Sequence, residues 1–476
     1  VTELNDAPEY DMPTATSAFV EDPNAAPNAP TVVPNFITNM RPGPAAAVDE
    51  GPLRENQRIT QFIVTALDPT LFDPAFLPAI DATTGTLTYR LNPDVNTRVP
   101  FPSILVRVVA VDSGLNDPGN AVPRNINNSV PRTFTILPDP INDAPVFTLQ
   151  PTASSREDQG VVTVPNFITG AAVGPATALD EFVSQTLRPV VVEPLDPTAF
   201  TATGQPRIVL DSSGRGVLTY ETNRDVNSFT GHDLRVRVIV QDTGGTANAG
   251  DVDTTIKTFS LNVAPINDAP SFTLPVPPAV TVDEDNETVT GVTPTVLPLA
   301  TNVVAGPATA LDETTIPATR QTWVFETVAF SNPTLFVATP QVLPNGNLTF
   351  TTRTDRNGQS VVVVRMRDSG PDSSTGNGDV NVSIDQTFTI NIRAINDAPV
   401  FDIRPTANSR EDQGVVSIAN FATGMAVGPA TAGDELASQS FQVNVRALDP
   451  AAFTATGQPA IAADGTLTFQ TALDVN

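Results

Sequence analysis

Alternating apolar and polar residues mark the clearest strands of this chain. Val236, Val238 and Val240 fall on one face of the segment 234–240, and two arginines fall on the other. This period of two is typical of a half-buried β-strand. The same spacing recurs along the chain, and we expect these further residues to face inward: Val106, Val108, Ala110, Val362, Val364 and Met366 in equivalent strands, and Phe259, Leu261, Val263, Phe388, Ile390 and Ile392 in the strands that close each repeat.

These short strands are separated by loops rich in Gly, Asn and Asp, such as residues 242–253. Valine, isoleucine, threonine and phenylalanine dominate the strands, and no amphipathic helix is evident. Several short strands at regular spacing are typical of a β-sandwich, and 476 residues exceed one such domain. We therefore predict an all-β chain of tandem antiparallel β-sandwich modules in an elongated array, with less than about a tenth helix.

A repeated motif divides the chain. The string Asn-Asp-Ala-Pro begins at Asn5, Asn142, Asn267 and Asn396. Between these linkers the same features follow in one order: a Glu-Asp pair, a Gly-Pro-Ala stretch ending in Asp-Glu, a Pro-containing turn, a strand ending in an aromatic residue, and Asp-x-Asn. Ordered copies of this kind indicate tandem modules. We predict the tail of a preceding module at 1–8, modules at 9–145, 146–270 and 271–399, and an incomplete module at 400–476.

The fourth repeat lacks the two closing strands that follow Asp-x-Asn in the others. Its expected inward residues, Leu467 and Phe469, are therefore short of partners. Either the parent chain continues, or another subunit supplies strands by β-augmentation. Continuation is the interpretation that we favour.

The charge balance narrows the possible partners. The chain has 25 basic and 52 acidic residues, a net charge of −27, and Lys257 is its only lysine. Nucleic-acid binding needs a basic face, so no nucleic-acid partner is expected. The acidic surface suits a protein that repels its own copies or collects cations. No apolar run approaches the length needed to cross a bilayer, so we expect no membrane contact within this segment. With no cysteine there is no disulfide.

The later half of each repeat resembles the cadherin fold family. The order Gly-x-Leu-x-aromatic, Asp-x-x, Val-x-Val-x-x-x-Asp-x-Gly, Phe-x-Ile-x-Val and Asn-Asp-x-Pro-x-Phe is similar to the second half of a cadherin repeat, and still more similar to the cadherin-like and immunoglobulin-like modules of large bacterial surface proteins. The resemblance implies extracellular or cell-surface tandem modules with calcium at their junctions.

The resemblance also implies a set of calcium ligands at three junctions. It assigns Glu21, Asp94, Asn96, Asn142, Asp143, Asp180 and Asp242 to the first, Glu157, Asp225, Asn227, Asn267, Asp268, Asp312 and Asp368 to the second, and Glu284, Asp355, Asn357, Asn396, Asp397 and Asp434 to the third.

The linkers depart from the cadherin pattern. An Asp two positions before the linker Asn is replaced by Pro140, Pro265 and Ala394, and the second linker Asn is replaced by Ala144, Ala269 and Ala398. An alternative is therefore that Asp and Asn only build turns, through hydrogen bonds from side chain to backbone. The recurrence of the carboxylates at module ends favours calcium.

Residues suited to catalysis are scarce. His232 is the only histidine, and a surface turn residue is a better interpretation than a member of a catalytic triad. Trp323, the only tryptophan, is interpreted as a strand residue facing inward rather than a binding platform. Every acidic pair recurs in each repeat, which is unusual for an active site. We therefore expect no enzymatic activity.

Three functions stay open at this point. The first is a structural component of an extracellular fibre, stalk or surface layer, whose partners are further modules of the same chain or identical subunits. The second is a cell-surface adhesin that binds a receptor protein or a glycan. The third is a spacer that holds an unseen catalytic domain. The fold class alone does not decide among them.

Overall fold

The computed structural model describes residues 4–21, 29–50, 56–98, 103–115, 125–284, 295–372 and 378–475. Residues 1–3 of the predicted tail, and Asn476 of the fourth Asp-x-Asn motif, lie outside the described residues. The chain divides into two compact units, Val1–Ala264 and Pro265–Asn476, and each is described by itself. We use module 1 to module 4 for the predicted ranges 9–145, 146–270, 271–399 and 400–476. Each Asn-Asp-Ala-Pro linker is named after the module that follows it, and its residues are described with that module.

The regular secondary structure of the described residues is mainly β-strand, so the predicted all-β fold is confirmed. The α-helices among them are short: α1 (Leu179–Ser184), α2 (Leu311–Thr314) and α3 (Gly433–Ser438), with 6, 4 and 6 residues. Single 3₁₀ turns follow the Leu-Asp-Pro or Ser-Asn-Pro motifs: η1 (Pro69–Leu71), η2 (Pro197–Ala199), η3 (Pro333–Leu335) and η5 (Pro450–Ala452). Proline suits the first position of such a turn because its missing N–H would have no partner there.

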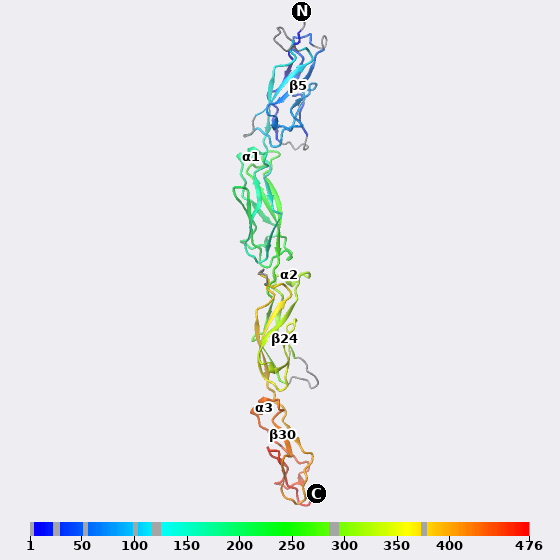
Figure 1. Ribbon diagram of the computed structural model, residues 1–476, viewed down its shortest axis with the longest axis vertical. Helices are drawn as coiled ribbons and strands as arrows, with labels where there is room; N and C mark the ends of the chain where they lie inside the picture. The colour runs from blue at the N-terminus through cyan, green and yellow to red at the C-terminus, as the bar shows by residue number, and fades with distance from the viewer. Residues whose placement is uncertain are drawn as a thin grey trace. The chain divides into compact units, whose positions relative to one another are not determined.

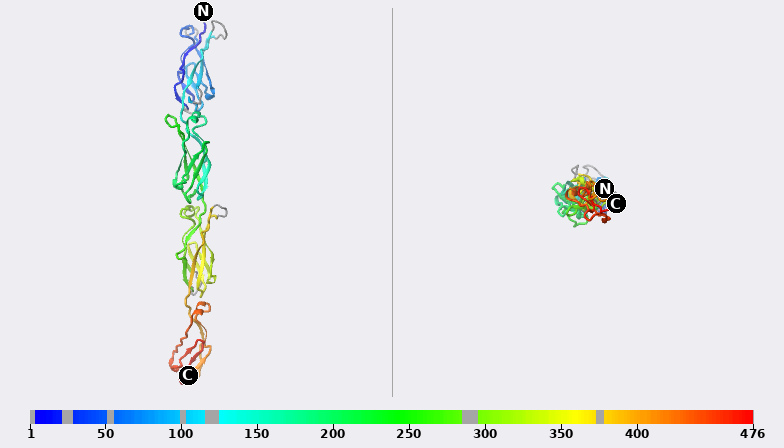
Figure 2. Two further views of the ribbon diagram at one scale, coloured as in Figure 1. Left: turned by 90° about the vertical axis from the view of Figure 1, so that its left-hand side faces the viewer. Right: turned by 90° about the horizontal axis from the view of Figure 1, so that it is seen from below.

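Module 2 forms a sandwich of two four-stranded sheets. One sheet has the order β11 (Val146–Leu149), β13 (Val162–Ala172), β16 (Gly216–Tyr220) and β15 (Arg207–Leu210). The other has the order β12 (Thr152–Arg156), β18 (Thr254–Ala264), β17 (Arg235–Gln241) and β14 (Val191–Pro194). Figures 1 and 2 show the strands of this module running side by side in both views. The pairs are antiparallel except β12 with β18, which is parallel.

Module 1 has the same plan, and most of its strands, apart from β5 and β8, are shorter. Its sheets are β1 (Glu9–Asp11) with β4 (Thr38–Arg41), β2 (Phe19–Val20) with β10 (Pro138–Asp139), β3 (Thr31–Val33) with β7 (Leu87–Tyr89) and β6 (Ala79–Ile80), and β5 (Ile59–Ala66) with β8 (Ile104–Asp112) and β9 (Arg132–Ile136). The pair of β2 and β10 is again parallel.

Module 3 lies in the second unit. Its sheets are β19 (Ser271–Thr273) with β22 (Thr301–Val304), β21 (Thr295–Pro298) with β25 (Asn347–Thr352) and β24 (Phe336–Val342), and β20 (Ala279–Asp283) with β27 (Gln386–Arg393), β26 (Gly358–Asp368) and β23 (Trp323–Phe330). Here β20 and β27 form the parallel pair.

Module 4 keeps only part of this plan. It has β28 (Val400–Ile403) with β30 (Ala422–Ala426), and β29 (Val416–Ile418) with β32 (Leu467–Phe469) and β31 (Ala460–Ile461). Residues 400–475, as described, contain no counterpart of β17 and β18. Phe401 is 60% exposed, whereas Phe147 and Phe272, at the same place after the linker, are 5% and 6% exposed.

The core of each module is separate. Four clusters of buried apolar residues each fall inside one predicted module range. The predicted inward face is confirmed, because Val236, Val238 and Val240 are all 0% exposed. The other residues predicted to face inward are buried as well. Burial of such side chains is the main stabilising contribution to a sandwich of this kind. The module boundaries themselves stay a prediction.

Candidate metal centre at the linkers

The linker asparagine of module 2 is held at the end of β17. Asn142 is 6% exposed, and its Nδ2 donates hydrogen bonds to Asp242 Oδ1 at 3.1 Å, Val252 O at 3.0 Å and Gly245 O at 3.2 Å. Asp242 directly follows β17 and is 0% exposed. The amide therefore joins the linker to the loop between β17 and β18, and its own Oδ1 is turned away from these partners.

The helix α1 brings a second carboxylate to the same place. Glu181 lies in its first turn, is 1% exposed, and accepts a hydrogen bond at Oε1 from the backbone N–H of Asp143 at 2.6 Å. Three buried oxygens then have no hydrogen-bond partner: Asn142 Oδ1, Asp242 Oδ2 and Glu181 Oε2. We call Asn142, Asp143, Glu181 and Asp242 the linker pocket of module 2.

Two glycines make room for these oxygens. A Cβ atom on Gly244 would lie 1.8 Å from Asn142 Oδ1, and a Cβ on Gly174 would lie 1.8 Å from Glu181 Oε2. Both glycines belong to recurring motifs, Asp-x-Gly and Gly-Pro-Ala. A side chain at either position would displace the oxygen beside it, so the space in the pocket depends on glycine.

The pocket is electrostatically unfavourable as it stands. Burial, together with the charges of Asp143, Asp180 and Asp242, raises the pKa of Glu181 to about 8, although the N–H of Asp143 lowers it. Burial also raises the pKa of Asp242. Such shifts mean that the carboxylates lack a compensating positive charge. A bound cation would supply that charge.

The same pocket recurs in other modules. In module 1, Asn5 Nδ2 donates to Asp112 Oδ1 at 3.2 Å, and the N–H of Asp6 donates to Glu50. In module 3, Asn267 Nδ2 donates to Asp368 Oδ1 at 3.1 Å, and the N–H of Asp268 donates to Glu313 Oε1 at 2.8 Å. Burial raises the pKa of Glu313 to about 8, and the charges of Asp268, Asp312 and Asp368 add to this shift.

A second recurring arrangement lies at the other end of modules 1, 2 and 3. Glu21 is 3% exposed and accepts hydrogen bonds from Asn96 Nδ2 at 2.8 Å and from the N–H of Ile141 at 2.9 Å. Burial raises the pKa of Glu21 to about 7, with Asp180 and Asp143 adding to the shift. The equivalent Glu–Asn pairs are Glu157 with Asn227 at 2.7 Å and Glu284 with Asn357 at 3.0 Å.

Within the first unit, the structure joins the predicted ligands of the first junction. Asn96 Nδ2 also donates to Asp180 Oδ1 at 2.9 Å. Asp94 accepts a hydrogen bond from the hydroxyl of Thr177, in the loop before α1. Five predicted residues, Glu21, Asn96, Asp143, Asp180 and Asp242, are thus linked by direct contacts or by the electrostatic effects described above.

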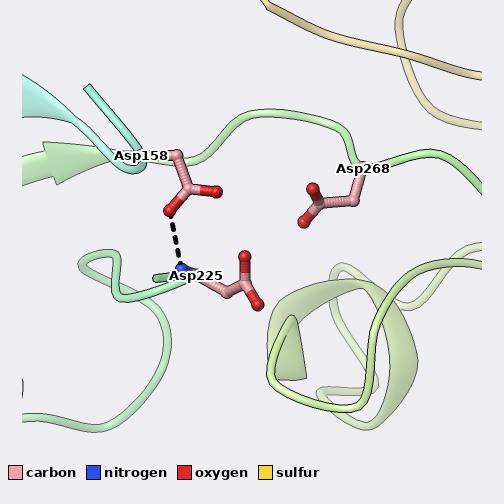
Figure 3. Close-up of side chains that lie close together, drawn as sticks. All are labelled: Asp158, Asp225 and Asp268. Atoms are coloured by element: carbon pink, nitrogen blue, oxygen red, sulfur yellow. Dashed lines mark hydrogen bonds between the residues drawn. The ribbon is translucent and has the colours of Figure 1, made fainter. Parts of the chain in front are cut away.

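The predicted ligands of the second junction are divided between the two units. Glu157, Asp225 and Asn227 belong to the first unit, where the N–H of Asp225 donates to Asp158 Oδ1 at 3.0 Å (Figure 3). Asp268, also labelled in Figure 3, belongs to the second unit, as do Asn267, Asp312 and Asp368. Asp312 and Asp368 are each 5% exposed.

At the third junction, part of the predicted set is brought together. Asp355 accepts a hydrogen bond from the hydroxyl of Thr431, and the N–H of Asp397 donates to Glu435. Asn396 is exposed and its Nδ2 donates to Asp397 O at 2.9 Å. Asn142, by contrast, donates to the loop between β17 and β18 of module 2, and the described residues of module 4 include no counterpart of that loop. Asp434 is half-buried.

The ligands predicted from the sequence do not include the second acid of any Asp-Glu pair. The ligand set implied by the resemblance includes Asp180, Asp312 and Asp434, but the contact with the linker N–H is made by the next residue: Glu50, Glu181, Glu313 and Glu435. The signal was present, since all four repeats carry this glutamate eight residues or fewer after a Gly-Pro motif. Asp158 and Asp251 were missed as well, and both accept backbone N–H groups.

The donor set fits calcium. Ca²⁺ binds six to eight oxygens from carboxylates, amides and backbone carbonyls at about 2.3–2.6 Å. The linker pocket offers unpaired buried oxygens of two carboxylates and one amide, with a further acid, Asp180, at its side. The chemistry of these donors, all oxygen, suits a hard cation rather than zinc.

The remaining sequence candidates have structural contacts. His232 Nδ1 lies 2.7 Å from Asp196 Oδ2, which joins two turns of module 2. Trp323 packs against the core of module 3, as the strand interpretation expects, and its Nε1–H donates to Pro344 O at 2.9 Å. No helix within the described part of the chain is long and apolar enough to span a bilayer.

Comparison with known proteins gives distant likenesses. No family model and no curated protein matches the chain. Among solved structures, protocadherin gamma B7 extracellular cadherin domains 1–4 is 13% identical, with 87% of this chain and 84% of that chain covered and a TM-score of 0.38. Drosophila N-cadherin domains EC1–4 are 14% identical, with 83% and 76% covered and a TM-score of 0.32. The human desmocollin-1 ectodomain is 12% identical, with 96% and 73% covered and a TM-score of 0.30. The similarity to tandem cadherin extracellular domains is therefore distant, and TM-scores this low carry no argument about function.

Proposed function

We propose that this chain is a structural component of an extracellular fibre, stalk or surface layer, and that its linker pockets bind calcium. The observation that carries the proposal is the linker pocket of module 2. There, Glu181 Oε2, Asp242 Oδ2 and Asn142 Oδ1 are buried without a hydrogen-bond partner. Leaving three such oxygens buried is costly unless a cation satisfies them.

Calcium in these pockets would connect the linker to the module that follows it. The linker supplies Asn142, α1 supplies Glu181, and the end of β17 supplies Asp242. A cation held by all three would fix the linker against the sandwich. Ca²⁺ sites of extracellular modules typically work at 10⁻⁴ to 10⁻³ M, so the proposed location implies sites that fill at millimolar calcium.

Repetition of the pocket supports a structural role over an enzymatic one. The pocket recurs in modules 1 to 3 with the same residue types, as expected of a device that stiffens each linker in turn. The adhesin function stays a prediction from the sequence. It would need a ligand-binding face in addition to the repeated features.

Calcium titration of the metal-stripped full chain by isothermal calorimetry tests the proposal. Replacing Glu181 by Gln removes one charge and keeps the shape, so we expect fewer calcium ions bound per chain. The matched control is Glu193→Gln, because Glu193 lies on the exposed side of β14 and only faces Arg237, 3.5 Å away. No heat of calcium binding in the wild-type chain at millimolar calcium, or equal stoichiometry for Glu181→Gln, contradicts the proposal.

A further inference from the structure

A threonine in the loop before α1 makes a contact that the calcium proposal does not use. The hydroxyl of Thr177, in module 2, donates to the carboxylate of Asp94, in module 1. In the second unit, the hydroxyl of Thr431, in module 4, donates to the carboxylate of Asp355, in module 3. We propose that the Gly-Pro-Ala-Thr loop is a docking element for the Asp-x-Asn turn of the preceding module, and that it couples consecutive modules without a metal ion.

The turn on the upstream side is shaped to present its carboxylate. Asp94 and Asp355 adopt left-handed backbone conformations, with φ of 61° and 51°. Asp tolerates this region better than most residues because its short side chain bonds locally. The two carboxylates are 4% and 5% exposed. The same conformation at both places sends an acceptor toward the following module.

The Gly-Pro-Ala-Thr loop of module 2 can be compared with the equivalent loop of module 1, which lacks the threonine. In module 2 the loop is closed by hydrogen bonds from Ala178 N to Pro175 O at 3.0 Å and from Leu179 N to Thr177 O at 2.8 Å. In module 1 the equivalent bonds are Ala47 N to Pro44 O at 2.8 Å and Val48 N to Ala46 O at 3.0 Å.

Module 1 therefore folds the same loop with alanine, Ala46, at the threonine position. The hydroxyl is not needed to shape the loop. At the first and third junctions, the threonine hydroxyl donates to a residue of the preceding module. We therefore assign this hydroxyl to coupling between modules and not to the fold of its own module.

The contact also concerns the same carboxylate that the resemblance assigns to calcium. Because Thr177 donates a neutral hydroxyl to Asp94, this contact does not need a cation, and we expect it to remain in excess chelator. The proposal thus goes beyond calcium binding, and it can hold even if no calcium binds.

The absence of cysteine from the chain allows the coupling to be measured directly. Spin labels are attached at cysteines replacing Ile63 and Val209, which are 48% and 54% exposed and lie in modules 1 and 2. A second pair replaces Val324 and Val415, 52% and 70% exposed, in modules 3 and 4. Electron–electron distance distributions are recorded for the full chain in excess chelator.

We expect Thr177→Ala to broaden the distribution of the first label pair and to leave the second unchanged. Thr431→Ala should do the reverse, and Thr177→Ser, which keeps the hydroxyl, should preserve the narrow distribution. An unchanged distribution in Thr177→Ala overturns the proposal, as does equal broadening in Thr177→Ala and Thr177→Ser. If Thr177→Ala broadens the distribution but also gives the circular dichroism spectrum of an unfolded chain, the proposal is overturned as well. The threonine would then be needed for folding and not for coupling.

Discussion

Asn267 donates from Nδ2 to Asp368 Oδ1 at 3.1 Å, which ties the linker to the last residue of β26. The same amide also donates to Val380 O at 2.9 Å and Pro371 O at 3.1 Å. One buried side chain thus satisfies three acceptors, and these acceptors lie in the module that contains the only tryptophan, Trp323. Fluorescence can therefore follow this module alone.

Removing that amide should weaken module 3. We expect Asn267→Ala to lower its free energy of unfolding by about 1–3 kcal/mol, the cost of leaving buried acceptors without a donor. Urea unfolding followed by Trp323 fluorescence measures it. Asn396→Ala is the control, because Asn396 is exposed and bonds only the adjacent carbonyl of Asp397. Equal and large losses for both variants contradict the anchoring role.

The stability of module 3 without calcium should depend on pH through Glu313. Burial raises the pKa of this carboxyl from 4.5 to about 8 in the folded protein. The folded state therefore holds the proton more tightly than the unfolded state. Stability should be highest in acid and should fall as the pH rises from 4.5 to about 8, when measured in chelator by Trp323 fluorescence.

The variant Glu313→Gln should flatten that fall, because glutamine does not ionise. Glu326→Gln is a suitable control. Hydrogen bonds from Arg367 and Arg365 lower the pKa of Glu326, so its contribution is lost only as the pH falls through that lowered value. A slope between pH 5 and 8 that survives in Glu313→Gln is evidence against this assignment.

Calcium should raise the unfolding midpoint of module 3. A ligand that binds only the folded state adds about 2.7 kcal/mol when present at 100 times its dissociation constant. Trp323 fluorescence in calcium and in chelator gives the shift for the wild-type chain. Glu313→Gln should reduce it, and Asp283→Asn, which changes a surface ion pair with Arg393, should not. Identical curves with and without calcium leave only the turn interpretation.

Removing the first aromatic residue after the linker should weaken module 3. Phe272 is 6% exposed. Truncating a buried phenylalanine to alanine costs about 3–5 kcal/mol, so Phe272→Ala should strongly destabilise the transition seen by Trp323. Val324→Ala, at a 52% exposed position of the same module, should leave that transition nearly unchanged. Equal losses in the two variants contradict the burial of this ring.

The sandwich could be predicted because its signal is local. The alternation of Val236, Val238 and Val240 fixes which face of one strand is buried, whatever the partner strands are. The direction of pairing has no such signal. Nothing in the residues of β12 shows that it runs parallel to β18, because parallel and antiparallel neighbours bury the same apolar face.

The candidate site was predicted less completely. A resemblance to cadherins implied Asp180, yet Glu181 makes the contact with the linker. In a helix as short as α1, adjacent residues point in different directions, and the sequence does not show where the helix begins. The glycines that leave space for Asn142 and Glu181 are a better signal, but their meaning depends on knowing which oxygen lies beside them.

The separation of the cores has a mechanical consequence. Because no buried residue is shared between two core clusters, a pulling force can unravel one module while the others stay intact. A module of roughly 125 residues drawn out to its contour length would add about 400 Å to the chain. A load along the chain would then be relieved in discrete steps, one for each module that unfolds.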